Sequence, residues 1–229
     1  MNKSKGVIYI AINKKWVKET VYSARSIKKV SPKLPITLFT DKKFKSECID
    51  NFIVSSTLKG TRFKFNYLNK TPYDYTLYLD SDTMVMSNII STFDILDKFD
   101  IITTPCICRT SKEDRDTISD YRNIPDSFYP FQGGVMFYRK TEKVTNFVRL
   151  WKTLYYKYKK EYNLTQDQTS LRIALWNSDL RIYMLPLEYN LKDYYRLNKF
   201  YKKIQPKIIH DHKLYSRSKK YISKNFKLI

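Results

Sequence analysis

The sequence predicts an α/β protein, a three-layer α/β/α sandwich around a mainly parallel, mixed sheet. Short apolar runs, typical of buried strands, alternate along the chain with segments whose apolar residues follow helical spacing. Hydrophobic residues make up 42% of the 229 residues and aromatic residues 16%. This is enough apolar surface for a core, and it excludes wholesale disorder.

The first part of the chain supplies three expected strands and two expected helices. The strands are the apolar runs at 7–12, 36–39 and 52–55. A helix is expected over 17–30, because apolar residues at helical spacing there precede Ser31-Pro32, which ends it. Residues 44–51 are interpreted as a short helix.

The remaining chain continues the alternation. Strands are expected at 75–79, 101–105, 135–138 and 182–185, and helices at 90–99, at 144–158 and after Thr165. The helix at 144–158 has the most regular helical spacing of apolar residues. Residues 109–130 are polar and carry both charge signs, so they are interpreted as a functional loop or lid rather than as core.

The chain is strongly basic, with a net charge of +21 from 43 Lys and Arg residues against 22 Asp and Glu residues. This charge favours anionic partners such as nucleotides, nucleic acid or an acidic membrane surface. A compositional bias toward lysine, asparagine, isoleucine and tyrosine would produce the same charge. Charge alone therefore does not select the partner.

Two further features concern location and organisation. Three cysteines, Cys48, Cys106 and Cys108, are too few for a disulfide framework, so a reducing, cytoplasmic setting is expected. No segment resembles a signal peptide or a membrane span, which favours a protein that is soluble or peripheral to a membrane. We expect one domain over 1–215 and a basic tail over 216–229 that suits an anionic membrane surface.

The most informative segment is the apolar strand 75–79, which runs directly into Asp80-Ser81-Asp82. Residues two apart on a strand point to the same face, so both carboxylates can turn toward one hard cation. The carboxyl ends of strands in open α/β sheets are also where ligands bind. Oxygen ligands favour magnesium or manganese, which can neutralise a diphosphate. The alternative is that two aspartates simply begin a turn.

This segment, with the residues that follow it through Val85, resembles the metal motif of GT-A glycosyltransferases, most closely the glycogenin-like and galactosyltransferase-like family eight. Three further segments occur in the order of that family. They are Phe131-Gln132-Gly133-Gly134-Val135, Thr165-Gln166-Asp167-Gln168 and Ile209-His210-Asp211-His212-Lys213. The resemblance spans roughly residues 6–215 and implies the Rossmann-like GT-A fold. The glycine and the Lys-Pro-Trp that usually follow the late histidine are absent.

The resemblance implies a metal site of Asp80, Asp82 and His210 that holds Mn²⁺ or Mg²⁺. Imidazole is a good manganese ligand beside carboxylates. His212 lies two residues further on, and chemistry alone does not separate the two histidines. A surface histidine in a basic tail is the alternative for His210. Lys213 is expected to contact the nucleotide-sugar donor.

Around the donor sugar, the resemblance implies contacts from Gln132, Gly133, Gly134, Asp167 and Gln168. The two glycines would let the sugar approach the backbone, although they also fit a bulge or tight turn. Thr165 and Gln168 also fit a capping box, and Asp167 in the first helical turn would suit the helix dipole.

The nucleotide is expected to contact the ends of the first two strands. The candidate residues are Ala11, Ile12, Asn13, Trp16, Thr40, Asp41, Lys64 and Ser81. Trp16 would stack on the base, or else belong to the core. Lys64 would meet the ribose or a phosphate, and a solvated surface lysine is an equally good interpretation.

Together these features predict a metal-dependent glycosyltransferase that transfers a sugar from a nucleotide-diphosphate donor, such as a UDP-sugar, to a carbohydrate or other hydroxyl acceptor. Retention of configuration is what family eight implies. The alternative is a basic nucleic-acid-binding protein or metal-dependent nuclease. No nucleic-acid-binding signature is present, so a nucleic-acid partner is not expected. An inactive interaction module is disfavoured by the intact Asp80, Asp82 and Asp167.

Overall fold

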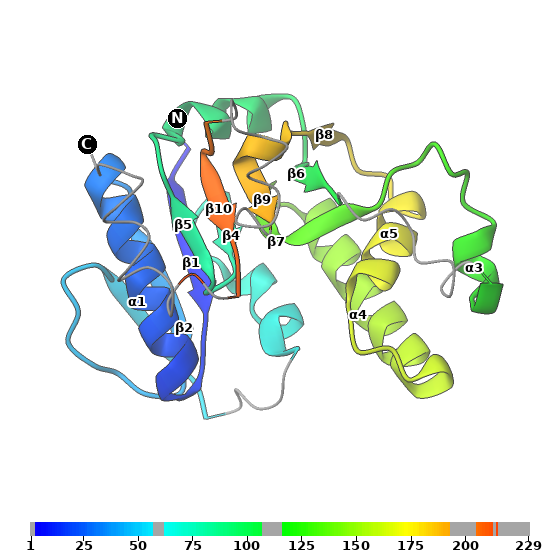
Figure 1. Cartoon of the computed structure of the whole chain (residues 1–229), viewed down its shortest axis with the longest axis horizontal. Helices are drawn as coiled ribbons and strands as arrows, with labels where there is room; N and C mark the ends of the chain where they lie inside the picture. Colours follow the sequence, from blue (N-terminus) through cyan, green and yellow to red (C-terminus); the bar gives the residue numbers. More distant parts are fainter. Residues whose placement is uncertain (1–2, 57–61, 107–115, 193–204, 213, 215–229) are drawn as a thin grey trace.

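The computed structural model describes residues 3–56, 62–106, 116–192, 205–212 and 214 (Figure 1). A seven-stranded sheet forms the middle layer, with order β3-β2-β1-β4-β7-β6-β8. Its strands are β1 Lys5–Ile10, β2 Ile36–Thr40, β3 Asn51–Val54, β4 Tyr75–Leu79, β6 Ile101–Pro105, β7 Phe131–Arg139 and β8 Ile182–Met184. Strand β7 is antiparallel to β4 and β6, whereas the other neighbouring pairs are parallel. The sheet is therefore mixed, as the sequence predicts.

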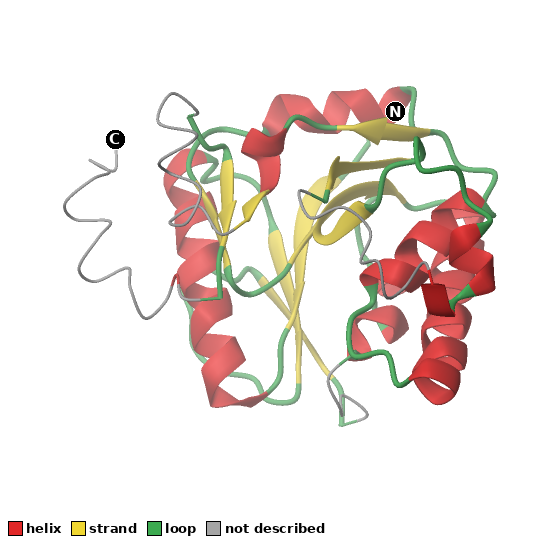
Figure 2. Ribbon diagram, turned by 45° about the vertical axis from the view of Figure 1, so that its right-hand side comes forward, coloured by secondary structure: helices red, strands yellow, loops and turns green. Residues whose placement is uncertain are grey.

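Helices cover both faces of this sheet (Figures 1 and 2). The α-helices are α1 Asn13–Val30, α3 Ser119–Arg122, α4 Glu142–Tyr162 and α5 Gln168–Trp176. Successive residues of β1 alternate between two separate cores. Val7 and Tyr9 pack with Ile27 of α1, and Ile8 packs with Phe147 of α4. This period of two places one apolar core on each face and makes the three-layer sandwich.

Helix α4 shows why the sequence signal was strongest there. The side chain of Thr141 accepts a hydrogen bond from the backbone N–H of Val144 and so caps the helix start. Asn163 ends the helix in the left-handed conformation, with φ of 53°. Between these ends, a buried stripe that includes Trp151 and Tyr155 faces the sheet.

A second, three-stranded sheet is built from segments that are far apart in the sequence. It contains β5 Thr83–Val85, β9 Leu191–Lys192 and β10 Ile208–His210, in the order β5-β10-β9. Strand β10 is antiparallel to β5, and His210 lies opposite Thr83 in the register. This pairing brings the late histidine next to the residues that follow β4. None of these three strands was predicted.

Other expectations need correction. The helix expected at 44–51 is wrong, because these residues form bends and extended chain. The helix expected at 90–99 is a 3₁₀ helix, η3 Ile90–Asp97, and shorter 3₁₀ turns lie at η1 Phe63–Asn66, η2 Leu68–Lys70 and η4 Leu187–Asn190. The strand expected from residue 135 begins at Phe131.

The expected lid over 109–130 is wrong for its described part. Ile118, Tyr121 and Ile124 are buried in one cluster with residues of α4 and α5. The fully buried guanidinium of Arg172 on α5 donates to the backbone carbonyls of Tyr121, Ile124, Pro125 and Phe128. Residues 121–128 are thus held against α5. The rest of the expected lid, 109–115, and the expected tail, 216–229, lie outside the described residues.

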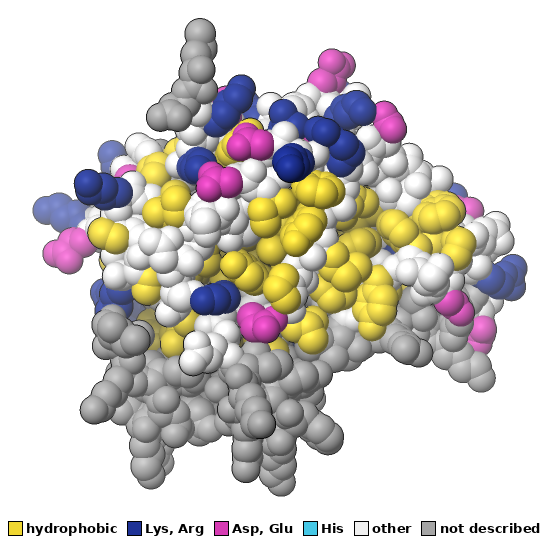
Figure 3. Space-filling model, turned by 90° about the horizontal axis from the view of Figure 1, so that it is seen from above, with side chains coloured by type: hydrophobic (Ala, Val, Ile, Leu, Met, Phe, Trp, Pro, Cys, Tyr) yellow, Lys and Arg dark blue, Asp and Glu magenta, His cyan; other side chains and the backbone are white. Residues whose placement is uncertain are grey.

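The face seen from above carries a broad area of apolar side chains among lysine and arginine side chains (Figure 3). Large exposed apolar residues of the described chain include Trp176, Tyr183 and Met184. Tyr183 and Met184 belong to β8, the edge strand of the main sheet, whose outer side has no neighbouring strand in the described residues. No described helix has the length and apolar character needed to cross a membrane.

Candidate active site

Two carboxylates and one imidazole converge just beyond the carboxyl end of β4. The Nε2 atom of His210 lies 3.2 Å from Oδ1 of Asp82 and 3.8 Å from Oδ2 of Asp80. One ligand atom from each of the three residues lies within 4.8 Å of the others. Pairing of β10 with β5 creates this arrangement, since it carries His210 to the turn that contains both aspartates.

The other nitrogen of the His210 ring has a partner of its own. Nδ1 lies 3.0 Å from Oδ1 of Asn190, and the side chain is 5% exposed. An amide oxygen can only accept, so Nδ1 carries a proton, and in the neutral ring Nε2 keeps its lone pair for a cation. Asn190 therefore selects the tautomer that a metal ligand requires.

The three residues fit a divalent cation. At metal–ligand distances of about 2.1 Å, neighbouring ligand atoms in an octahedral site are roughly 3 Å apart, which is close to the spacing between His210 and Asp82. Two carboxylates and one neutral imidazole form a donor set suited to manganese or magnesium. Tyr78 donates a hydrogen bond of 2.5 Å to Oδ1 of Asp80 and so orients that carboxylate.

His212 occupies a different position from His210. Its Nδ1 lies 2.5 Å from Oδ2 of Asp82, and its side chain is 77% exposed. The hydrogen bond to Asp82 raises the pKa of His212. Burial alone would raise the pKa of Asp82, yet the rings of His210 and His212 hold it well below its usual range. Of the two histidines, only His210 belongs to the three-residue cluster.

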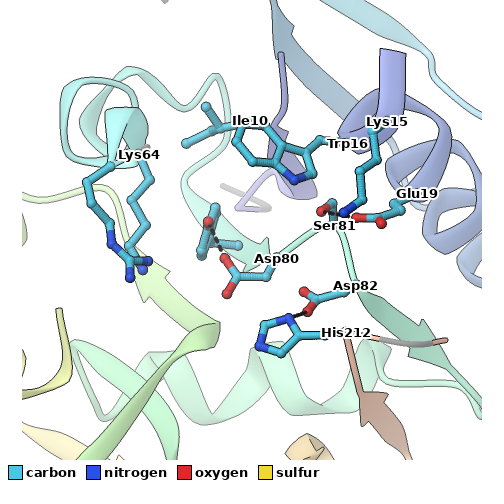
Figure 4. A pocket seen from close by; sticks show the side chains of 11 residues that line it. Ile10, Lys15, Trp16, Glu19, Lys64, Asp80, Ser81, Asp82 and His212 are labelled. Carbon is cyan, nitrogen blue, oxygen red and sulfur yellow. Dashed lines mark hydrogen bonds and ion pairs between the residues drawn. The ribbon is translucent and has the colours of Figure 1, made fainter. Parts of the chain in front are cut away.

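A cavity of about 410 Å³ opens beside the carboxylates (Figure 4). Asp80 lies near its centre, with Lys64 on one side and Glu19, Ser81 and Lys15 on the other. The lining residues are Ile10, Lys15, Trp16, Glu19, Arg62, Lys64, Tyr78, Asp80, Ser81, Asp82 and His212. The cavity thus has two sides that flank the carboxylate pair.

On the first side, a buried lysine faces a buried aspartate. Nζ of Lys64 lies 2.5 Å from Oδ2 of Asp167, and each side chain is 9% exposed. Arg62 is 3.7 Å from the same carboxylate. Burial alone would raise the pKa of Asp167, but Lys64 and Arg62 lower it. Lys64 is therefore not a solvated surface lysine. Lys64 and Arg62 line the cavity, and Asp167 is paired with both of them.

Gln168 and Gln132 lie beside this pair. Nε2 of Gln168 donates to Oε1 of Gln132 at 2.8 Å, and Nε2 of Gln132 donates to Sγ of Cys106. The expected capping box is wrong, because α5 is capped by Asp167, with no side-chain hydrogen bond at the cap. The side chain of Gln168 points to Gln132 instead.

Gly133 and Gly134 lie inside β7, so the expected tight turn is wrong. The alternative, a bulge, agrees with the shift in register between β6 and β7 at this point. A Cβ atom on Gly134 would lie 2.3 Å from the ring of His210 and 2.6 Å from Oδ2 of Asp80. Only a glycine lets the strand pass this close to the carboxylate–imidazole cluster.

The second side of the cavity is built from α1. Trp16 and Glu19 line it, and Ser81 donates a hydrogen bond to Oε2 of Glu19 at 3.2 Å. Burial raises the pKa of Glu19. Asn13 accepts hydrogen bonds from the backbone N–H groups of Lys15 and Trp16, which fixes the start of the helix.

Several predicted contacts do not line the cavity in the described part of the chain. Ala11 is buried, and Ile12 and Asn13 lead into α1. Thr40 ends β2 and Asp41 follows it, and β2 is separated from β4 by β1. The residues Gln132, Gly133, Gly134, Asp167, Gln168 and His210 are not among those that line this cavity. Lys213 is outside the described residues.

Sequence reasoning missed Ile10 and Lys15 of the cavity lining, and four residues with polar roles at the site. Tyr78 could have been found, because it lies two residues before Asp80 and shares its face of the strand. Glu19 lies one helical turn after Trp16, which was a weaker signal. Arg62 precedes η1 and Asn190 ends η4, and such short 3₁₀ turns give no periodic pattern in the sequence.

No protein-family model matches the sequence, and no curated protein is significantly similar to it. Solved structures, in contrast, are clearly similar. The galactosyltransferase LgtC, in complex with donor and acceptor sugar analogs, superimposes with a TM-score of 0.60 at 13% identity, over 90% of this chain and 87% of LgtC. The fold is that of the GT-A glycosyltransferases.

Two longer proteins have similar structures. The glycosyltransferase GlyE of Streptococcus pneumoniae TIGR4 has a TM-score of 0.60 at 16% identity, with 91% of this chain and 54% of GlyE covered. The bifunctional glycosyltransferase WbbM has a TM-score of 0.58 at 16% identity, with 92% and 46% covered. This chain therefore spans about half the length of these two proteins.

Proposed function

We propose that this protein is a metal-dependent glycosyltransferase that transfers a sugar from a UDP-sugar to a hydroxyl group of a carbohydrate or other acceptor. The observation that carries the proposal is the convergence of Asp80, Asp82 and His210 on one point beside a cavity. The similar fold of LgtC, which was crystallised with donor and acceptor sugar analogs, supports it.

In this proposal, Asp80, Asp82 and the Nε2 atom of His210 hold a Mn²⁺ or Mg²⁺ ion. Such an ion would supply positive charge to neutralise a diphosphate leaving group. Asn190 keeps the proton of His210 on Nδ1, and Tyr78 orients the carboxylate of Asp80. Lys213 is proposed as a further donor contact.

Two cationic side chains, Lys64 and Arg62, line the side of the cavity where we propose that the donor sugar binds. Lys64 and Arg62 face the cavity and are held in place by Asp167. We propose that Lys64 and Asp167 bind hydroxyls of the donor sugar, with Gln132 and Gln168 beside them. Retention of the anomeric configuration is part of the proposal, and NMR of the product would reveal an inverted product if it is wrong.

The test is a thermal-shift titration of the purified chain with UDP, with and without Mn²⁺. A ligand that binds only the folded state raises the melting temperature, so UDP should stabilise the protein only when Mn²⁺ is present. GDP tested in the same way checks the choice of base. Stabilisation by UDP that is equal in EDTA would contradict the metal site.

A nuclease or nucleic-acid-binding function is the second candidate from the sequence. Paired carboxylates do serve two-metal nucleases. Among the described residues, however, one potential ligand group is found, and it contains three residues. Stabilisation by a single-stranded oligonucleotide, and not by UDP with Mn²⁺, would favour this candidate. Contact of the tail with an anionic membrane stays a prediction.

A further inference from the structure

A carboxylate forms part of the cavity wall on the side away from Lys64. Glu19 on α1 is 8% exposed and lines the cavity next to Ser81 (Figure 4). Its Oε2 accepts the Ser81 hydroxyl at 3.2 Å. A carboxylate has acceptor capacity for about four hydrogen bonds, so this contact leaves most of the capacity for a ligand.

The order of side chains along this wall matches the order of groups in a nucleoside diphosphate. Trp16 offers an aromatic surface at one end, and the Asp80–Asp82 pair lies at the other. Ser81 lies between Trp16 and Asp82, and Glu19 lies beside Ser81, joined to it by the hydrogen bond. In a nucleotide, the ribose lies between the base and the diphosphate in the same way.

The chemistry of Glu19 selects among these groups. A carboxylate accepts hydrogen bonds and repels phosphate, so the group that faces it must carry donors. A ribose carries two neighbouring hydroxyls, and a diphosphate carries none. Lys15, which also lines the cavity, contributes positive charge near Glu19 and partly offsets its charge.

We propose that Glu19, oriented by Ser81, binds the 2′- and 3′-hydroxyls of the donor ribose and makes the site selective for ribonucleotides over deoxyribonucleotides. This inference rests on the proposed function, because it assigns one part of the donor to one part of the same cavity. Glu19 is then a specificity-determining residue.

A purely structural role for Glu19 predicts a different result. If the carboxylate serves only to hold Ser81, then Glu19→Gln keeps the size of the side chain and an oxygen that accepts the hydroxyl. Such a variant would bind ribose and deoxyribose nucleotides with the same ratio as the wild type.

The experiment measures dissociation constants by calorimetry for UDP, 2′-deoxy-UDP and 3′-deoxy-UDP with saturating Mn²⁺. A site built to bind a hydroxyl discriminates against the analogue that lacks it, so the wild type should prefer UDP over a deoxy analogue by about tenfold. In Glu19→Gln this preference should fall below about threefold, mainly through weaker binding of UDP. Glu161→Gln, an exposed glutamate on α4, is the matched control and should keep the wild-type preference.

The outcomes separate the two proposals. Equal binding of UDP and both deoxy analogues by the wild type, or an unchanged preference in Glu19→Gln, overturns the ribose assignment and leaves the proposed function intact. Failure of the wild type to bind UDP with Mn²⁺ overturns both. Thermal melts without ligand check that Glu19→Gln folds, and Glu19→Ala should lose the preference in the same way.

Discussion

Helix α5 carries two buried charged residues that are stabilised in opposite ways. Arg172 is fully buried and donates its hydrogen bonds to the backbone carbonyls of the segment 121–128. Asp167, at the start of the same helix, is 6% exposed and is paired with Lys64 and Arg62 at the cavity wall. Arg172 holds a loop in place, whereas Asp167 fixes the direction of two cations that face the cavity.

This difference shows how buried charge indicates function. Removing two opposite charges from water costs about as much as their attraction returns, so a buried ion pair is weak evidence for stability. An arginine that satisfies several backbone carbonyls, in contrast, replaces hydrogen bonds that the loop would otherwise lose. We therefore expect changes around Asp167 and the carboxylate pair to affect activity most, and changes at Arg172 to affect stability alone.

The largest effect is expected for Asp82→Asn, which removes one charged ligand of the proposed metal site. Loss of several kcal/mol of leaving-group stabilisation should lower the transfer rate by about a thousandfold or more. The melting temperature should fall by no more than about 3 °C, because asparagine has the size of aspartate and leaves the packing of the side chain unchanged. The measurement is sugar transfer with Mn²⁺, alongside a thermal melt.

Asp94→Asn is the matched control for this change, since Asp94 is exposed and pairs only with Lys5 among the described contacts. It should keep full activity. Wild-type activity that survives EDTA, or an active Asp82→Asn protein, would remove the metal site from the proposal.

The next effect concerns the Lys64–Asp167 pair. Lys64→Met leaves the buried carboxylate of Asp167 with only the more distant Arg62 as a partner. The free energy of unfolding, measured in urea, should therefore fall by about 3 kcal/mol. The double variant Lys64→Met/Asp167→Leu removes both charges and should recover most of that stability. Neither variant should transfer sugar. A double variant that is active would show that the pair is structural.

Arg172→Met tests the other buried charge of α5. The change removes the hydrogen-bond donors to four backbone carbonyls, and water can reach some of these carbonyls instead. We therefore expect the free energy of unfolding to fall by about 2 kcal/mol and the melting temperature to fall by roughly 4–8 °C. Arg172 does not line the cavity, so activity below the melting transition should be unchanged. A strong loss of activity in folded protein would mean that residues 116–130 contribute to the site.

Regular periodicity explains which parts of the fold could be predicted. The buried strand 75–79 and helix α4 carry clear patterns of period two and 3.6, and the structure agrees with both. The short strands β5, β9 and β10 contain two or three residues, which is too few for a pattern. They form because distant segments pair with each other, and such pairing leaves no local signal.

The site shows the same limit. Asp80 and Asp82 were found because a strand leads into them, and His210 came from resemblance rather than from any local pattern. The sequence does not decide between a ligand contact and a surface lysine for Lys64, because burial of a lysine depends on a partner, Asp167, that is 103 residues away in the chain. Asn190 gave no signal at all, since its role depends only on where the ring of His210 lies.

Asn190 is the subject of the smallest expected effect. Its Oδ1 accepts the Nδ1 proton of His210 and so holds the lone pair of Nε2 toward Asp80 and Asp82. In Asn190→Ala the ring can take the other tautomer or rotate, and loss of such a supporting hydrogen bond weakens metal binding by about tenfold. The apparent Mn²⁺ affinity, measured by titration, should therefore fall while UDP binding at saturating Mn²⁺ stays close to wild type.

His212→Ala provides the comparison for Asn190→Ala, because His212 touches the other oxygen of Asp82 from an exposed position. His212→Ala should change the Mn²⁺ affinity less than Asn190→Ala does, although the side chain of His212 contacts the Asp82 carboxylate directly. A larger effect of His212→Ala would instead place the metal-binding imidazole at His212. That result would leave Asn190 with a structural role, because the proton that it fixes would then have no bearing on the metal.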